Sequence, residues 1–419
     1  MLKKIIVPVL ITLFAAGALI VGLSVRAAAK EPVTLSFWEQ DGADQQALLD
    51  EFITEFHKKY PSITVKRTHY ETEELRHTFV DAAIAGQGPD VVLGPNDNLG
   101  VFVPGNLIVP ALEVMGREFL KGFTQPSLTA ASFNGQSYMV PDRNGNELCL
   151  IYNKKLVSSA PKTWDEMIGM AAKLRKEGKI QYAVVFNQTE PYFTLPMLGA
   201  FGGQVFDDPN SSRAKPTLDT PQVRKWIQWL DAIHRDGQIP AHADYDIAST
   251  LFQEGKAAFL INGPWCFVNF IESYNMDIGI AAIPRVNGKW PMPYFAVKGY
   301  SVSRIAASDP DRKEACRLFI EYVTSRECQI RMMETHQQLP TLISALKDKA
   351  VTGDPLIAGQ LDSLGKGTPM PVITQMRAVW DAIKPVQQQV FAGTISPEDA
   401  PAIMQKQAED GIRALGIRQ

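Results

Sequence analysis

The chain has 419 residues, of which 45% are hydrophobic and 21% charged, values typical of a globular protein and not of a disordered or multi-spanning one. Its 42 basic and 45 acidic residues form no basic stripe, which excludes the charge pattern of a nucleic-acid-binding protein. The length is sufficient for two ordinary domains with separate hydrophobic cores.

The N-terminus is typical of an export signal. Two lysines at positions 3 and 4 precede an uncharged run over residues 5–25, and three alanines at 27–29 supply small residues for cleavage. We predict a signal peptide over residues 1–29, although the uncharged run is also long enough to remain as a membrane anchor. No cysteine lies near this junction for lipid attachment, which favours a periplasmic protein.

The mature chain begins with alternating strand and helix patterns. Residues 33–38 alternate apolar and polar side chains as a strand does, residues 48–56 have apolar side chains at helical spacing, and residues 63–65 begin another strand. A helix over 73–85 and an apolar strand over 91–93 complete a βαβαβ order. This order favours a mostly parallel sheet covered by helices.

The same alternation continues along the chain and predicts an α/β fold. The predicted strands are 148–152, 182–186 and 257–261, and the predicted helices are 163–176, 221–236, 247–254, 313–324, 376–390 and 397–415. Thr163 is placed to cap the first of these helices, with Glu166 three residues further on.

Four cysteines are too few for a disulfide scaffold, even in an oxidising compartment that permits bonds. Cys316 and Cys328 fall on one predicted helical stretch, about 18 Å apart along the helix axis, so a bond between them would require a break in the helix. We therefore expect mostly buried free thiols at these positions and at Cys149 and Cys266.

Three predicted strands end in loops that carry polar or aromatic side chains, and ligands meet such loops in α/β sheets. The candidates are Asp97 after the strand at 91–93, Glu190 and Tyr192 after the strand at 182–186, and Trp265 after the strand at 257–261. Carboxylates accept hydrogen bonds from sugar hydroxyls, and aromatic rings lie against the C–H face of a sugar. The loops are candidates for a carbohydrate site, but spacing alone does not show that they converge.

Each candidate also has a structural interpretation. Trp265 and Tyr192 are of types that pack in cores, Asp97 could cap the helix after its loop, and Glu190 could simply be solvated. Trp380 lies on a predicted helix, where core packing is the alternative. We assign the other tryptophans to structure, namely Trp164, Trp226, Trp229 and Trp290.

No metal or cofactor is expected. The six histidines are scattered without a metal-binding pattern, and His69 and His77 are interpreted as surface residues. Neither a phosphate-binding loop, a dinucleotide fingerprint nor a hydrolase nucleophile motif is present.

Several segments taken in order are similar to those of one family. These segments are 88–90, 151–154, 161–164, 186–193, 255–256, 261–265, 370–371 and 375–380. Together they resemble the maltose-binding proteins, which are the sugar receptors of bacterial ABC importers. The resemblance covers essentially the whole mature chain and is most specific at 186–193 and 261–265.

The resemblance implies an α/β, two-lobed periplasmic binding protein fold, in which hinge-linked lobes close on a ligand in the cleft between them. We expect one lobe to comprise residues 30–143 and 299–348, and the other to comprise residues 144–298 and 349–419. The chain should then cross between the lobes more than once.

The resemblance also implies roles for individual residues. Asp97 and Glu190 match family carboxylates that bind the sugar. Tyr192, Trp265 and Trp380 match stacking aromatic rings.

Two further residues are assigned through the resemblance. Asp41 lies in a segment where the family has polar sugar contacts. Asn146 aligns with a family glutamate and is followed by Glu147.

Some positions depart from the family pattern. Gly94 and Asn98 stand where close relatives have tryptophan and arginine, and Asp381 and Lys384 where tyrosine and arginine are usual. These changes alter the contacts expected for maltose itself and affect the oligosaccharide interpretation less.

We interpret the chain as an extracytoplasmic, monomeric, non-enzymatic receptor that delivers an oligosaccharide, maltose or maltodextrin, to the membrane permease of an ABC importer. A periplasmic glycoside hydrolase is one alternative, because it would also combine aromatic residues with two carboxyl groups, about 5–9.5 Å apart. A receptor for a non-sugar solute is another. Anion binding would favour basic pocket residues or free helix N-termini, and only Lys384 suggests either.

Overall fold

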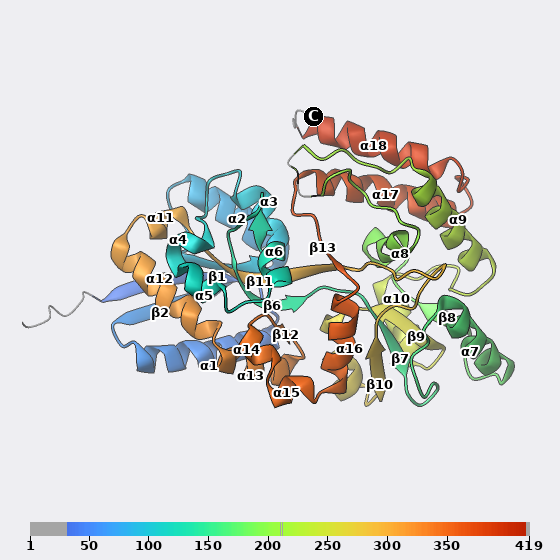
Figure 1. The fold of residues 1–419 in the computed structure, drawn as a ribbon, viewed down its shortest axis with the longest axis horizontal. Helices are drawn as coiled ribbons and strands as arrows, with labels where there is room; N and C mark the ends of the chain where they lie inside the picture. Colours follow the sequence, from blue (N-terminus) through green and yellow to red (C-terminus); the bar gives the residue numbers. More distant parts are fainter. Residues whose placement is uncertain (1–31, 210, 212, 416–419) are drawn as a thin grey trace, which may run out of the picture.

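The computed structural model describes residues 32–209, 211 and 213–415, so the predicted signal peptide lies outside the described residues. Figure 1 shows two lobes, with the N-terminal elements in one and the middle of the chain in the other. Each lobe is built around its own sheet. Within the described ranges, no helix is long and apolar enough to cross a membrane.

The larger sheet has the strand order β12-β6-β11-β3-β1-β2, with β13 beside β11. Its strands are β1 (Val33–Glu39), β2 (Ile63–His69), β3 (Val91–Pro95), β6 (Val140–Gly145), β11 (Tyr294–Val302), β12 (Leu339–Pro340) and β13 (Thr368–Pro369). β1 is parallel to β2 and β3, as predicted, but β11 is antiparallel to β3 and β6. The prediction of a mostly parallel sheet is wrong for the sheet as a whole. β6 follows the helices of residues 99–130 and runs in the same direction as β3, but β11 returns from the other lobe between these two strands and is antiparallel to both.

The smaller sheet has the strand order β10-β7-β9-β8 and is also mixed. Its strands are β7 (Cys149–Asn153), β8 (Tyr182–Val185), β9 (Ala257–Asn262) and β10 (Ile278–Ala281). β8 and β9 are parallel, whereas β7 is antiparallel to both β9 and β10. All six residues of β9 are buried, which explains its nearly continuous apolar sequence.

The larger sheet is covered mainly by helices from the first and last thirds of the chain (Figure 1). These helices are α1 (Ala43–Lys59), α2 (Thr72–Ile84), α3 (Leu99–Phe102), α4 (Ala111–Met115), α5 (Arg117–Leu120), α6 (Gln125–Ala130), α11 (Arg304–Ala307), α12 (Pro310–Val323), α13 (Arg326–His336), α14 (Ile343–Leu346) and α15 (Lys349–Thr352). The rings of Phe37 and Phe56 both pack edge-on against Phe319, with centroids 5.2 and 5.3 Å away, and join β1, α1 and α12 into one core.

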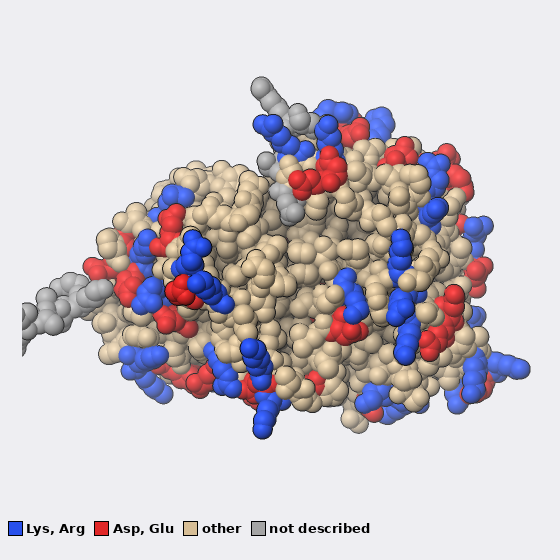
Figure 2. Space-filling view, viewed as in Figure 1, with Lys and Arg blue, Asp and Glu red and all other residues tan. Residues whose placement is uncertain are grey.

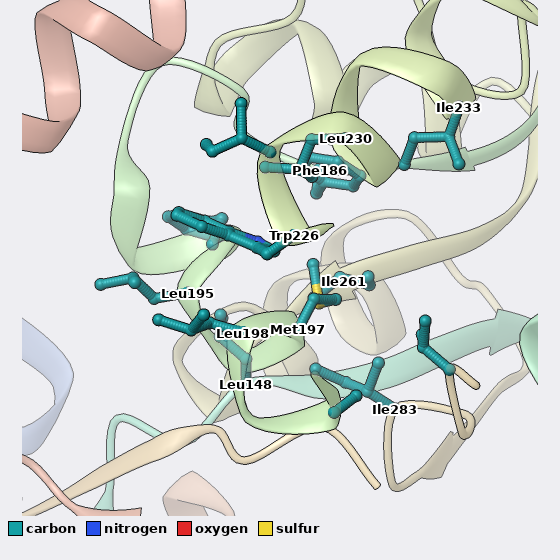
Figure 3. Close-up of a cluster of buried hydrophobic side chains, with 14 of the residues drawn as sticks. Leu148, Phe186, Leu195, Met197, Leu198, Trp226, Leu230, Ile233, Ile261 and Ile283 are labelled. Carbon is teal, nitrogen blue, oxygen red and sulfur yellow. The ribbon is translucent and has the colours of Figure 1, made fainter. Parts of the chain in front are cut away.

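The helices of the other lobe are α7 (Trp164–Lys176), α8 (Leu195–Ala200), α9 (Pro221–Arg235), α10 (Tyr245–Gln253), α16 (Pro355–Leu364), α17 (Gln375–Phe391) and α18 (Ala400–Ala414). Trp226 of α9 lies at the centre of their core, near Leu195 and Leu198 (Figure 3). Its indole N–H donates to the Thr194 carbonyl over 3.1 Å, so the buried polar atom is satisfied.

Short elements fill the connections. They are the hairpin β4 (Ser132–Phe133) and β5 (Gln136–Ser137), the 3-10 helices η1 (Asn96–Asn98), η2 (Pro191–Phe193) and η3 (Pro264–Cys266), and the short π-helix η4 (Asn269–Ser273). The predicted cap is confirmed, because the Thr163 hydroxyl accepts from the Glu166 N–H over 3.1 Å.

The four cysteines are buried and unpaired, as expected. The placement of Cys316 and Cys328 on one helical stretch is wrong, because α12 ends at Val323 and α13 begins at Arg326. Ser325 causes the break, since its side chain accepts from the Cys328 N–H and caps the new helix.

The chain passes from the larger sheet to the smaller one at residues 146–148, between β6 and β7, and returns at 282–293, between β10 and β11. Helix α16 packs on β10, where a β-carbon at Gly359 would lie 2.2 Å from the Ile280 carbonyl oxygen. Only glycine permits this close approach. In the larger sheet, β6 ends at Gly145 before the first connection, and β11 begins at Tyr294 after the second.

Candidate functional site: a pocket between the two sheets

A pocket of about 510 Å³ lies between the sheets, which is within the range of roughly 300–1,000 Å³ usual for ligand sites. Its wall consists of Gln40, Gly42, Gln45, Pro95, Asp97, Arg143, Asn144, Gly145, Asn146, Pro264, Trp265, Ala296, Val297, Lys298, Gln338 and Met370. Most of these residues come from strand ends of the larger sheet, and Pro264 and Trp265 come from the smaller one. Amides and one exposed aromatic ring therefore face the same space.

Asp97 reaches the pocket from η1, directly after β3. The Arg76 guanidinium on α2 contacts Asp97 Oδ2 at 2.8 Å and the Asn98 side-chain carbonyl at 2.8 Å, which fixes the turn. The alternative of a helix cap is not realised, since Asn98 is the N-cap residue of α3 and no side chain caps it. Asp97 is thus a carboxylate held at the pocket wall.

Trp265 reaches the pocket from η3, directly after β9. Its indole N–H donates to the Tyr245 hydroxyl over 3.1 Å, and 40% of the residue is exposed. A β-carbon at Gly263 would lie 2.0 Å from the indole, so this glycine lets the ring lie against the backbone. Core packing, the alternative considered for Trp265, does not describe this position.

Asp41 lies behind the pocket wall. Its side chain is fully buried and is ion-paired with Arg143 and with Lys298, whose Nζ is 2.6 Å away. Burial alone would raise the pKa of Asp41, but the two cations hold it well below its usual value. Burial also raises the pKa of Asp142 to about 6, although its partner Arg143, 2.5 Å away, lowers it. The structure thus gives Asp41 two cationic partners.

The two cations in this wall were missed in the sequence. The expectation that only Lys384 could supply a basic group is wrong, because Arg143 and Lys298 line the pocket whereas Lys384 does not. One feature of the sequence could have indicated a buried ion pair here, namely the two adjacent charged residues Asp142 and Arg143 in the short strand β6. All its residues but the last are buried, so charged side chains there need partners.

Tyr192 and Asn146 are in contact beside the pocket. The Tyr192 hydroxyl donates to the Asn146 carbonyl, and the Tyr294 carbonyl lies 3.2 Å from the same hydroxyl. Asn146 has a left-handed backbone, with φ of 65°, and its exposed side chain lines the pocket. Asn146 lies in the connection at 146–148, and Tyr294 directly follows the connection at 282–293, so Tyr192 is hydrogen-bonded beside both of these connections.

Glu190 and Trp380 lie next to Tyr192 and do not line the pocket. Glu190 is ion-paired with Lys384 of α17, and both are half-exposed. The Trp380 ring is 6.2 Å from the rings of Tyr192 and Tyr294. The structure therefore gathers Asp97, Asn146 and Trp265 around one pocket. Glu190, Tyr192 and Trp380 form a separate cluster connected to it through Asn146.

Glu147, immediately after Asn146, is fully buried, and neither of its carboxyl oxygens has a hydrogen-bond partner within the described part of the chain. Burial raises the pKa of Glu147 to about 8. A buried carboxyl group with a raised pKa therefore lies at the first connection between the sheets. Nothing in the sequence pattern distinguishes it from a solvated glutamate.

The sequence pattern of the bacterial extracellular solute-binding proteins matches residues 51–359. The chain belongs to this family. The solute-binding protein is 28% identical over 347 residues to a maltotriose-binding protein of Pyrococcus abyssi, a match that covers 82% of this chain and 74% of the relative. It is 26% identical over 331 residues to a maltooligosaccharide ABC transporter solute-binding lipoprotein of Streptococcus pneumoniae, covering 75% of this chain and 74% of the relative.

The solute-binding protein also resembles a solved structure. The maltose/maltodextrin-binding domain from Bdellovibrio bacteriovorus, bound to maltotriose, is 35% identical and superimposes with a TM-score of 0.77, covering 91% of this chain and 100% of that domain. The resemblance to maltose-binding proteins and the two-lobed α/β fold are confirmed. These relatives are binding proteins, as the non-enzymatic interpretation expects.

Proposed function

We propose that this solute-binding protein is an extracytoplasmic receptor that binds a maltooligosaccharide between its lobes and delivers it to an ABC importer. The observation that carries the proposal is the pocket between the sheets, which both the Asp97 carboxylate after β3 and the exposed Trp265 ring after β9 line. A pyranose presents hydroxyls at its edge and C–H groups on its faces. The Asp97 carboxylate can accept hydrogen bonds from the hydroxyls, and the Trp265 ring can lie against a C–H face.

The energies are adequate without a metal or a covalent step. A hydrogen bond to a charged group contributes about 1.5–3 kcal/mol, and an aromatic contact about 0.5–1.5 kcal/mol. Micromolar binding requires about 8 kcal/mol. Asp97, Trp265 and the amides of Gln40, Asn144 and Asn146 supply enough groups to reach it.

Binding, rather than hydrolysis, is supported by the acidic groups. A glycosidase needs two carboxyl groups across the scissile bond. Among the described residues that line the pocket, Asp97 is the only acidic one. Glu190 is paired with Lys384 outside the lining, and Asp41 is buried between two cations.

The mechanism that follows is closure of two lobes. Residues 144–145 and 294–298 are the strand segments nearest the connections, and we place the hinge there. The ligand favours the closed form by contacting both lobes, and the permease recognises that form. The protein acts as a periplasmic monomer after removal of residues 1–29, with lobes divided close to the predicted boundaries at 143/144, 298/299 and 348/349.

Maltotriose should raise the melting temperature of the purified protein, because a ligand that binds only the folded state stabilises it. Calorimetry would give the affinity, and chromatography of the same mixture should recover maltotriose intact. Release of glucose would identify a hydrolase instead. An unchanged melting temperature across maltose, maltotriose, trehalose, sucrose and cyclodextrins would exclude these sugars and contradict the proposal.

Trp265→Ala should weaken maltotriose binding at least about tenfold, a loss of about 1.4 kcal/mol, with little change in melting temperature. The reason is that Trp265 lines the pocket and is 40% exposed, so its ring is not part of the buried core. Calorimetric titration measures the effect. Trp290→Ala is the matched control, because Trp290 packs under Arg285 and Lys366 away from the pocket and should leave affinity unchanged.

A further inference from the structure

Lys298 is a cation in the pocket wall. The pairing of three strands sets the direction of its side chain. On β11 it lies opposite Arg143 of β6 and opposite Pro95 of β3. Like charges directly opposite each other in a sheet repel. Asp41 removes the repulsion, because one of its oxygens contacts both cations.

The sheet is irregular at this point. Arg143 is paired with Lys298 and Pro141 with Gly299, so Asp142 is an extra residue on β6. Such bulges redirect side chains and occur often beside binding sites. The strands also approach closely here, since a β-carbon at Gly299 would lie 2.4 Å from the Val140 carbonyl oxygen. The backbone therefore fixes where Lys298 points.

The Lys298 ammonium group has hydrogen-bonding capacity left. It carries three N–H donors, and in the described part of the chain Asp41 is its one partner. Its side chain is 24% exposed and lines the pocket. Donors that Asp41 does not use are thus available to an oxygen atom in the pocket.

We propose that Lys298 is a ligand-binding residue, which donates a hydrogen bond to a hydroxyl oxygen of the saccharide, and that Asp41 is the positioning residue that holds it. This proposal rests on the proposed function and deepens it. It adds that the site selects an uncharged hydroxyl and not a carboxylate or a phosphate.

The charge balance supports an uncharged ligand. The two cations that line the pocket, Arg143 and Lys298, are paired with Asp41, and Arg143 also with Asp142. The lining carboxylate Asp97 is itself paired with Arg76. A bound anion would find no unbalanced positive charge to offset the loss of its hydration. The surface between the lobes is also mainly uncharged on the face shown in Figure 2.

The test is calorimetry of maltotriose binding by the wild type and three variants. Lys298→Met should bind at least tenfold more weakly, and Lys298→Gln, which keeps a neutral N–H donor, should recover part of the loss. Lys154→Met is the matched control, because Lys154 forms an exposed pair with Asp277 at 2.8 Å away from the pocket and its loss should not change affinity. Excess glucuronate should not displace maltotriose from the wild type.

The outcomes separate this proposal from the proposed function. If the wild type binds maltotriose and Lys298→Met binds equally well, Lys298 is not a contact and the proposal fails alone. Displacement of maltotriose by glucuronate would show that the site recognises a negative charge on the ligand. A Lys298→Gln variant that binds maltotriose as weakly as Lys298→Met would show that the positive charge of Lys298 is required. Either result would overturn the proposal that the site selects an uncharged hydroxyl. A wild type that binds none of the sugars tested overturns the proposed function and this proposal with it.

Discussion

Asp41→Asn is expected to lower the free energy of unfolding by about 3–5 kcal/mol, the usual effect of removing one partner from a buried ion pair. The variant leaves Arg143 buried with Asp142 alone and leaves Lys298 opposite it without a shared anion. Urea denaturation at pH 7 measures the change. The same substitution should weaken maltotriose binding, because Lys298 loses the group that holds it.

The effect of Asp41 should depend on pH in a defined direction. Its pKa is held far below the ordinary 3.8, so its contribution is complete above about pH 4 and is lost progressively as the pH falls from there through the lowered value. The stability difference between variant and wild type should therefore shrink in strong acid.

Asp277→Asn is the control for the loss of a carboxylate. It removes an exposed partner of Lys154 and should change stability by less than about 1 kcal/mol. An Asp41→Asn variant as stable as the wild type would show that the buried ion pair contributes nothing. Adding Lys298→Met to Asp41→Asn should recover part of the loss, because it removes an unpaired cation.

The sequence predicts the order of the elements because each one is specified locally. The apolar spacing of residues 48–56 gives α1, and the Thr163 cap begins α7, without information from elsewhere in the chain. Asp97 and Trp265 were predicted for a related reason. The end of a strand can be predicted from the local sequence, and ligand sites often lie at the ends of strands. The pattern could not show that these two residues face one pocket, because they are 168 positions apart.

The ion pairs and the strand pairing that could not be predicted from the sequence depend on contacts between distant residues. Asp41 is 102 positions from Arg143 and 257 from Lys298, and Glu190 is 194 from Lys384. Periodicity carries no information about such pairs, nor about the irregular register between β6 and β11 that redirects Lys298. The mostly parallel sheet failed for the same reason, as β6 and β11 pair by tertiary position and not by a local βαβ unit.

Glu147→Gln is expected to stabilise the protein increasingly as the pH rises from about 4.5 to about 8, by an amount on the order of 5 kcal/mol at the upper end. Burial raises the pKa of Glu147 from 4.5 to about 8 in the folded state. Over this interval the unfolded chain releases the proton and the folded chain retains it, so the wild type loses stability with rising pH. Glutamine cannot ionise and avoids this loss. Urea denaturation at pH 5 and pH 8.5 measures it.

The structural reason lies in what surrounds Glu147. Its titratable neighbours are Tyr192 and Cys149, whose pKa values are raised well above normal, first by burial and then by the charge that Glu147 would carry. Burial is the main influence on the pKa of Glu147, and within the described part of the chain no cation contributes to it. Glu113→Gln, at an exposed position on α4, is the control and should follow the wild type at every pH. Parallel stability curves for Glu147→Gln and the wild type would mean that Glu147 is ionised and solvated, and that the connection between the sheets admits water.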